Sequence, residues 1–214
     1  YLQSMNRRTS LQHLAAMGTA LFTPSALSLV MADLLKRKIP STGELLPCVG
    51  LGTWQTFDVG MFDADPAPLK EVLRAMSESG GKVIDSSPMY GSSEKVIGDL
   101  SIGLGVNDQL FMATKVWTSG QEAGIRQMEN SFRLLKRSTM DLMQVHNLVD
   151  WQTHLKTLTK WKGEGKVRYI GLTHYLDSSH TTVETIITNH KIDFIQINYS
   201  LGSRNAENRL LPTA

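Results

Sequence analysis

The chain has 214 residues, of which 41% are apolar and 20% are charged, and these values are typical of a globular protein that buries a substantial core. A net charge of +2 without any basic tract gives no support for a nucleic-acid-binding surface. No run of 18 apolar residues is present, so the sequence predicts no membrane span. The single cysteine, Cys48, cannot form an intrachain disulfide, and we expect it to be buried on the first predicted strand.

The amino-terminal residues have the features of processing segments rather than of the fold. Residues 1–4 resemble the remnant of a purification tag. Residues 5–28 contain the pair Arg7-Arg8, then the mildly apolar stretch Leu11–Phe22 and small residues. This order resembles a twin-arginine export signal and predicts a periplasmic protein. The alternative is an amphipathic helix with an incidental arginine pair, which would leave the protein in the cytoplasm.

Residues 29–214 alternate short apolar runs with stretches of helical periodicity. A hairpin is expected at 39–46. A strand is expected at 49–51, and a second short strand is expected to end at Val83-Ile84. Further strands are expected at 110–114, 140–145, 167–173 and 194–198. Helices are expected at 66–79, 92–100, 122–135, 151–161 and 179–189, with a further one beginning at 206. This alternation is typical of an α/β fold with a parallel sheet.

Polar residues stand at the ends of three successive predicted strands. Asp85, Lys115 and His146 are 30 and 31 residues apart, which matches one strand–helix unit each. Tyr90 lies on a short loop five residues after Asp85. In a parallel barrel the carboxyl ends of all strands open onto one face, so we expect these four side chains to converge there. Taken by itself, the stretch around Asp85 and Tyr90 could equally be an ordinary surface turn.

Six short motifs occur in a familiar order from residue 50 onwards. They are Gly50-Leu51-Gly52-Thr53-Trp54, the stretch 84–94, Thr114-Lys115-Val116-Trp117, Gln144-Val145-His146-Asn147, Gly171-Leu172-Thr173-His174-Tyr175 and Gln196-Ile197-Asn198-Tyr199. With these motifs the chain resembles the aldo-keto reductases. The resemblance implies a (β/α)8 TIM-barrel fold, which closes at about 250 residues. Residues 29–214 supply about six of the eight strand–helix units, so we expect a partial barrel without the last two units.

The resemblance also implies a reaction: hydride passes from a reduced nicotinamide to an aldehyde or ketone, and a proton goes to the carbonyl oxygen. Tyr90 would give that proton, and Lys115 would lower the pKa of its phenol. Asp85 would hold Lys115 charged and aimed. His146 would orient the carbonyl oxygen or help relay the proton. The expected partner is a small carbonyl compound, and the oligomeric state is left open.

The cofactor and substrate contacts also come from the resemblance. Thr173, His174 and Gln196 match positions that bind the nicotinamide, although His174 stands where asparagine is common. Trp54 and Trp117 are expected to line the substrate pocket. The expected cofactor is NADP, with NAD as the alternative.

Other classes of function have less support in the sequence. The stretch Gly98–Gly105 lacks the glycine spacing of a Rossmann fingerprint. His146, His154, His174 and His180 do not form a His-Glu-x-x-His pattern, so no metal site is expected. The stronger alternative is a non-catalytic cofactor-binding barrel or an inactive truncated fragment.

Overall fold

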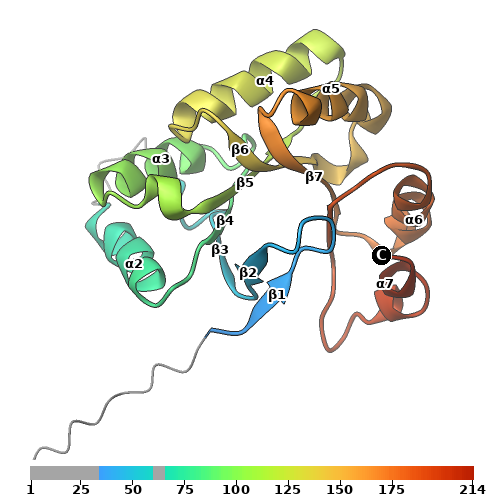
Figure 1. Ribbon diagram of the computed structural model, residues 1–214, viewed down its shortest axis with the longest axis horizontal. Coiled ribbons are helices and arrows are strands. Elements are labelled where there is room, and N and C mark those ends of the chain that lie inside the picture. The colour runs from blue at the N-terminus through green and yellow to red at the C-terminus, as the bar shows by residue number, and fades with distance from the viewer. Residues whose placement is uncertain (1–33, 60–65) are drawn as a thin grey trace, which may run out of the picture. The chain divides into compact units, whose positions relative to one another are not determined.

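A computed structural model describes residues 34–59 and 66–214 (Figure 1). The predicted tag remnant at 1–4 and the predicted export signal at 5–28 lie outside the described residues. Within the described ranges, no helix is long and apolar enough to cross a membrane.

The strands form a small hairpin and a parallel sheet. The hairpin consists of β1 (Lys36–Lys38) and β2 (Leu45–Pro47), which pair antiparallel. Six further strands pair in parallel, and their order in the sheet is their order in the chain. They are β3 (Gly50–Gly52), β4 (Val83–Asp85), β5 (Phe111–Val116), β6 (Met140–Val145), β7 (Val167–His174) and β8 (Phe194–Ile197). The expected partial barrel with six parallel strands is therefore confirmed.

Helices connect successive strands and lie along the outer side of the curved sheet (Figure 1). They are α2 (Ala67–Glu78), α3 (Ser93–Gly103), α4 (Gln121–Leu134), α5 (Trp151–Gly163) and α6 (His180–Asn189). The last predicted helix is broken in two. A 3-10 turn, η4 (Asn205–Glu207), comes first, and a short helix, α7 (Leu210–Thr213), follows.

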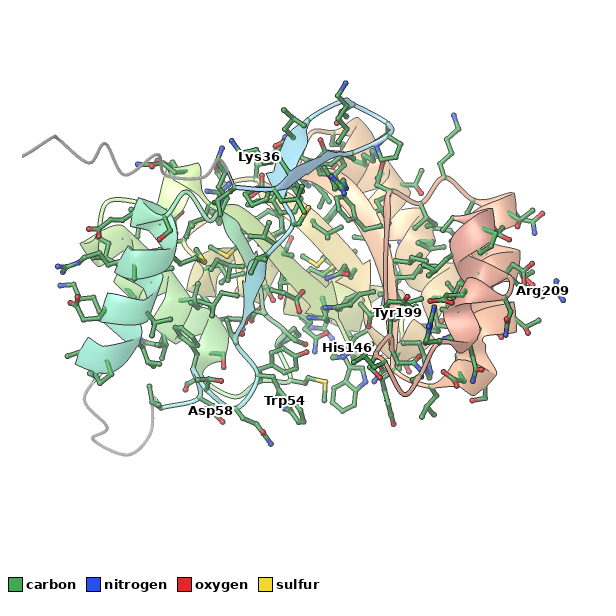
Figure 2. The ribbon with its side chains drawn as sticks, turned by 90° about the horizontal axis from the view of Figure 1, so that it is seen from below. Lys36, Trp54, Asp58, His146, Tyr199 and Arg209 are labelled. Atoms are coloured by element: carbon green, nitrogen blue, oxygen red, sulfur yellow. The ribbon has the colours of Figure 1, made fainter. Side chains whose placement is uncertain are left out.

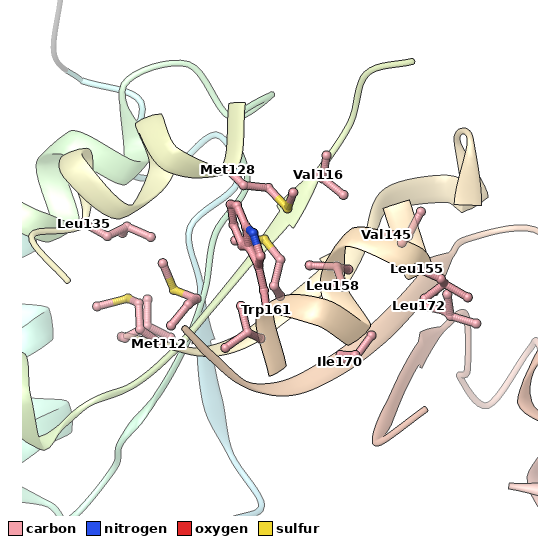
Figure 3. Packing of buried hydrophobic residues seen from close by; sticks show 14 of the residues in the cluster. Met112, Val116, Met128, Leu135, Val145, Leu155, Leu158, Trp161, Ile170 and Leu172 are labelled. Atoms are coloured by element: carbon pink, nitrogen blue, oxygen red, sulfur yellow. The ribbon is translucent and has the colours of Figure 1, made fainter. Parts of the chain in front are cut away.

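The larger core lies between the outer face of the sheet and these helices. Strand residues such as Met112, Val145 and Leu172 pack there against Leu158 and Trp161 of α5 (Figure 3). The buried apolar residues of α5 are Leu155, Leu158 and Trp161, which recur at helical spacing. Successive side chains of a strand point to opposite faces of a sheet. Because one face of every strand packs in this core, the residues in between point to the inside of the curved sheet.

The inner face has its own apolar floor, made of Ile39, Leu46, Phe111, Ala113, Leu142 and Tyr169. The hairpin covers this floor and is held by polar contacts. Tyr169 donates to Glu44 at 2.6 Å and shares a hydrogen bond with Thr42 at 2.8 Å. The floor closes the amino-terminal end of the sheet, so the inner face is accessible from the carboxyl end.

The expected burial of Cys48 is wrong, because its side chain is exposed. The first barrel strand begins at Gly50, and Cys48 lies in the connection that precedes it. Its backbone N–H is bonded to the carbonyl of Leu35 at 2.9 Å, which fixes the connection without burying the thiol.

Candidate active site

A layer of polar side chains lies above the apolar floor, and the two-residue period of the strands puts it there. Phe111 and Ala113 belong to the floor, and Lys115 comes two residues later on the same face of β5. Leu142 and then Gln144 follow the same rule on β6, and Lys115 and Gln144 are paired in register. The strand ends therefore bring the polar residues together at the carboxyl end of the sheet.

Lys115 and Asp85 form the centre of this layer. The Lys115 side chain is 1% exposed, and its Nζ lies 2.7 Å from Oδ2 of Asp85. The same Nζ donates to the carbonyl oxygen of Ser86 at 2.8 Å. Burial lowers the pKa of Lys115, and the Asp85 carboxylate opposes that shift by favouring the charged ammonium. The predicted Asp85–Lys115 contact is thus present.

The loop after β4 brings Tyr90 over this pair. The backbone N–H of Tyr90 bonds the carbonyl of Ser87 at 3.0 Å, and the Tyr90 carbonyl accepts from Ser93 at the start of α3. The phenol ring then lies 6.5 Å from the Trp54 ring and 6.1 Å from the His146 ring, centroid to centroid. Among the described residues, the Tyr90 hydroxyl has no hydrogen-bond partner, so it is available to a bound molecule.

The pKa of Tyr90 differs from the sequence expectation. We expected Lys115 to lower it, but burial, followed by the Asp85 carboxylate, raises the pKa of Tyr90 to about 12. The charge of Lys115 is already paired with Asp85, and its Nζ lies over the ring, 4.9 Å from the centroid. The phenol therefore keeps its proton throughout the neutral range.

His146 follows β6 directly and is 7% exposed. Burial, then the nearby Lys115 ammonium, lowers the pKa of His146 to about 4, so its imidazole is neutral at neutral pH. Its Nδ1 lies 3.1 Å from the Ser87 Oγ. Among the described residues, Nε2 has no hydrogen-bond partner, and the ring lines the cavity beside Tyr90.

A cavity of about 480 Å³ opens above these groups. Tyr90, Lys115 and His146 line one part of it, and Trp54, which is 62% exposed, stands at its rim. Figure 2 shows Trp54 and His146 at the end of the molecule opposite to Lys36 of the hairpin. Trp117, the other predicted pocket residue, is not among the lining residues, but its ring lies 6.4 Å from that of His146.

Comparison with known proteins shows to which family the chain belongs. Residues 48–214 match the model of the aldo/keto reductase family. The chain belongs to this family. It is 29% identical to aldo-keto reductase YhdN of Bacillus subtilis over 82% of the chain and 57% of that protein. It is 30% identical to methylglyoxal reductase YeaE of Escherichia coli over 83% of the chain and 63% of that protein.

Solved aldo-keto reductases share the fold. The structure of a Klebsiella pneumoniae aldo/keto reductase in complex with NADP and acetate superposes with a TM-score of 0.67 at 29% identity. That match covers 79% of this chain and 60% of the other. The chain thus spans roughly three fifths of the length of these relatives, 57%, 63% and 60% respectively. The (β/α)8 barrel relationship predicted from the motifs is confirmed.

Two of the three positions predicted to bind the nicotinamide in this aldo/keto reductase have polar atoms left for a ligand. The Oγ1 of Thr173 accepts from the N–H of Asn147 at 3.2 Å, so its own proton remains available. Gln196 donates from Nε2 to Asp85 at 3.2 Å, which leaves its carbonyl oxygen to accept. Both residues line the cavity.

His174 also lines the cavity, but its two ring nitrogens are engaged within the chain. Its Nδ1 accepts from the backbone N–H of Leu176 at 3.2 Å, and its Nε2 is 3.0 Å from the Ser179 Oγ. The ring stacks on Tyr175. For His174 to bind a nicotinamide, one of its two hydrogen bonds, to Leu176 or to Ser179, must therefore break.

Sequence reasoning missed three residues that hold the site together. Gln144 donates from Nε2 to Oδ1 of Asp85 at 3.1 Å, and its position two residues before His146 on the same strand face could have revealed it. Asp58 accepts from the N–H and the hydroxyl of Ser92, each at 2.8 Å, and so ties the Trp54 loop to α3. Ser87 contacts His146 across 59 residues of sequence, and no local pattern indicates that contact.

Proposed function

We propose that this protein reduces an aldehyde or a ketone to the alcohol, with NADPH as the hydride donor. One observation carries the proposal. Tyr90, Lys115 and His146 come from three successive strand ends and line one cavity, and Asp85 pairs with Lys115 at 2.7 Å. This arrangement places two groups whose polar atoms have no partner among the described residues, the Tyr90 hydroxyl and the His146 Nε2, beside a buried ion pair.

Tyr90 acts as the proton donor in this proposal. Reduction of a carbonyl develops negative charge on its oxygen, and an alkoxide is a stronger base than a phenolate. A phenol whose pKa is about 12 therefore holds its proton until that charge appears and can then give it up. General acid catalysis of this kind typically contributes on the order of 10²–10⁴-fold.

His146 stabilises the charge that develops, and Lys115 contacts the ring of the proton donor. A neutral His146 can donate a hydrogen bond from Nε2 to the carbonyl oxygen without adding a full charge to the buried site. The Lys115 ammonium lies over the Tyr90 ring, 4.9 Å from its centroid, and is attracted by the negative face of that ring. Asp85 keeps the ammonium in place, and Gln144 and Gln196 hold the carboxylate.

The cofactor assignment rests on solved relatives that contain NADP or NADPH, among them two from Klebsiella pneumoniae. A bound NADPH supplies the hydride. In this chain, Thr173 and Gln196 would hold the nicotinamide, since the hydroxyl of Thr173 can donate and the side-chain carbonyl of Gln196 can accept. His174 fits less well, because both of its nitrogens are bonded within the chain.

The experiment measures NADPH consumption with methylglyoxal, chosen because the relative YeaE is a methylglyoxal reductase, and with an aromatic aldehyde. Replacing Tyr90 by Phe should leave the fold and NADPH binding intact and reduce the rate about 10²–10⁴-fold. Tyr199→Phe is the matched control, since that hydroxyl contacts Glu207 outside the cavity lining. Retention of more than half the rate by Tyr90→Phe would refute Tyr90 as the donor. NADPH binding without consumption of any aldehyde would favour a non-catalytic barrel.

A further inference from the structure

Ser87 lies behind His146 and is completely buried. Its Oγ is 3.1 Å from Nδ1 of His146. The same oxygen accepts a longer hydrogen bond, 3.4 Å, from the backbone N–H of Met89. The Ser87 hydroxyl therefore connects the loop that carries Tyr90 with the imidazole of His146.

The direction of the Ser87–His146 bond follows from counting protons. A backbone N–H can only donate, so Met89 uses an acceptor position of the Ser87 oxygen. The hydroxyl proton of Ser87 then needs an acceptor, because an unsatisfied buried donor is costly. Among the described residues, Nδ1 of His146 is the acceptor within hydrogen-bond distance.

The state of the imidazole agrees with this direction. Because the pKa of His146 is lowered to about 4, the ring carries one proton at neutral pH and that proton is on one nitrogen only. If Nδ1 accepts from Ser87, the proton is on Nε2. In the opposite tautomer, the N–H groups of His146 Nδ1 and Met89 would both donate to the Ser87 oxygen, and the Ser87 hydroxyl proton would have no acceptor among the described residues.

We propose that Ser87 is a positioning residue that holds His146 in the tautomer with its proton on Nε2, the nitrogen next to the cavity. The consequence for catalysis rests on the proposed function, since only that tautomer can donate a hydrogen bond to a carbonyl oxygen. Ser87 itself does not line the cavity, and it acts through the ring that it orients.

The direct test is nitrogen-15 NMR of the full chain at pH 7 without cofactor or substrate. His146→Gln identifies the His146 signals by their loss. We expect Nε2 to be protonated, and Nδ1 to be unprotonated and shifted by an accepted hydrogen bond. A His146 with its proton on Nδ1 in the wild-type chain would overturn the inference, whatever the behaviour of any variant.

Ser87→Ala should convert this single tautomer into a mixture. Ser101→Ala is the matched control, because Ser101 is also buried and accepts from Asn107 at 2.7 Å, but it lies on α3 away from His146. The control should leave the His146 signals unchanged. If Ser87→Ala folds and its His146 signals are those of the wild type, Ser87 does not set the tautomer. Failure of this variant to fold would leave the wild-type measurement as the deciding result.

The kinetic consequence is a loss in kcat with an unchanged dissociation constant for NADPH. Because one hydrogen bond of this kind is lost, the kcat of Ser87→Ala should be about three- to tenfold lower than that of the wild type. The thiol of Ser87→Cys is a weaker donor of similar size, so the kcat of this variant should lie between those of the wild type and Ser87→Ala. If the tautomer shifts as expected and no aldehyde is reduced by any form, the inference about Ser87 holds and the proposed function fails.

Discussion

The Nζ atom of Lys115 lies over the face of the Tyr90 ring, 4.9 Å from its centroid. An ammonium in this position is attracted by the negative face of the ring. Its charge is paired with Asp85, so the buried phenol keeps a high pKa. The influence of Lys115 is instead clear at His146, where the ammonium is the second cause, after burial, of the lowered pKa.

Replacing Lys115 by Met should raise the pKa of His146 from its wild-type value of about 4 towards the ordinary value of 6.5. The substitution removes a positive charge that disfavours the imidazolium and leaves the Asp85 carboxylate without its partner, and both changes favour protonation. An NMR titration of His146 measures the shift. Lys162→Met is the matched control, because Lys162 pairs with Asp193 at 2.5 Å in another part of the chain. Equal His146 titrations in the two variants would contradict this electrostatic role of Lys115.

Tyr90 should make the protein less stable in alkaline solution. The folded-state pKa of about 12 lies above the ordinary value of 10.0, so the phenol favours folding below pH 10. This contribution is lost as the pH rises from 10 through 12, because the unfolded chain releases the proton first. Urea unfolding of wild type and Tyr90→Phe at several pH values tests this. The difference in unfolding free energy between the two proteins should be constant up to about pH 9. Above pH 10 the unfolding free energy of the wild type should fall relative to that of Tyr90→Phe. A constant difference up to pH 12 would show that the phenol pKa is not raised.

The sequence allowed the strand ends to be identified, because Asp85, Lys115 and His146 interrupt apolar runs at regular spacing. It also identified the loop position of Tyr90. The phenol pKa could not be predicted in the same way, since it depends on burial and on which carboxylate neutralises Lys115. Long-range contacts such as that of Ser87 with His146 depend on the relative positions of β4 and β6, which no local pattern specifies.

The amino-terminal segment gives a prediction that is independent of the barrel. We propose that residues 5–28 direct export by the twin-arginine route, on the basis of the pair Arg7-Arg8 before an apolar stretch. Arg7→Lys combined with Arg8→Lys should then retain the protein in the cytoplasm of its host. Cell fractionation with an antibody measures this. Detecting the unsubstituted protein only in the cytoplasm, with its amino terminus uncleaved, would reject the export signal.

Gly98 should be essential for packing α3 against α4. A Cβ at this position would lie 2.0 Å from the carbonyl oxygen of Leu134 and 3.0 Å from Cα of Leu135, both of them backbone atoms. Backbone cannot rotate away as a long side chain can, so Gly98→Ala must separate the two helices. Overpacking of this kind typically costs about 1–3 kcal/mol, and we expect a loss at the upper end of that range.

Gly103→Ala is the matched control for this prediction, since Gly103 lies on the same helix. A Cβ at Gly103 would have no atom within 4 Å. Alanine is preferred over glycine in helices by about 0.5–1 kcal/mol, and Gly103 is the last residue of α3, so a small gain in stability is expected. Urea unfolding of both variants should therefore give changes of opposite sign. If Gly98→Ala were as stable as Gly103→Ala, α3 and α4 could not be as close as the Gly98–Leu134 contact requires.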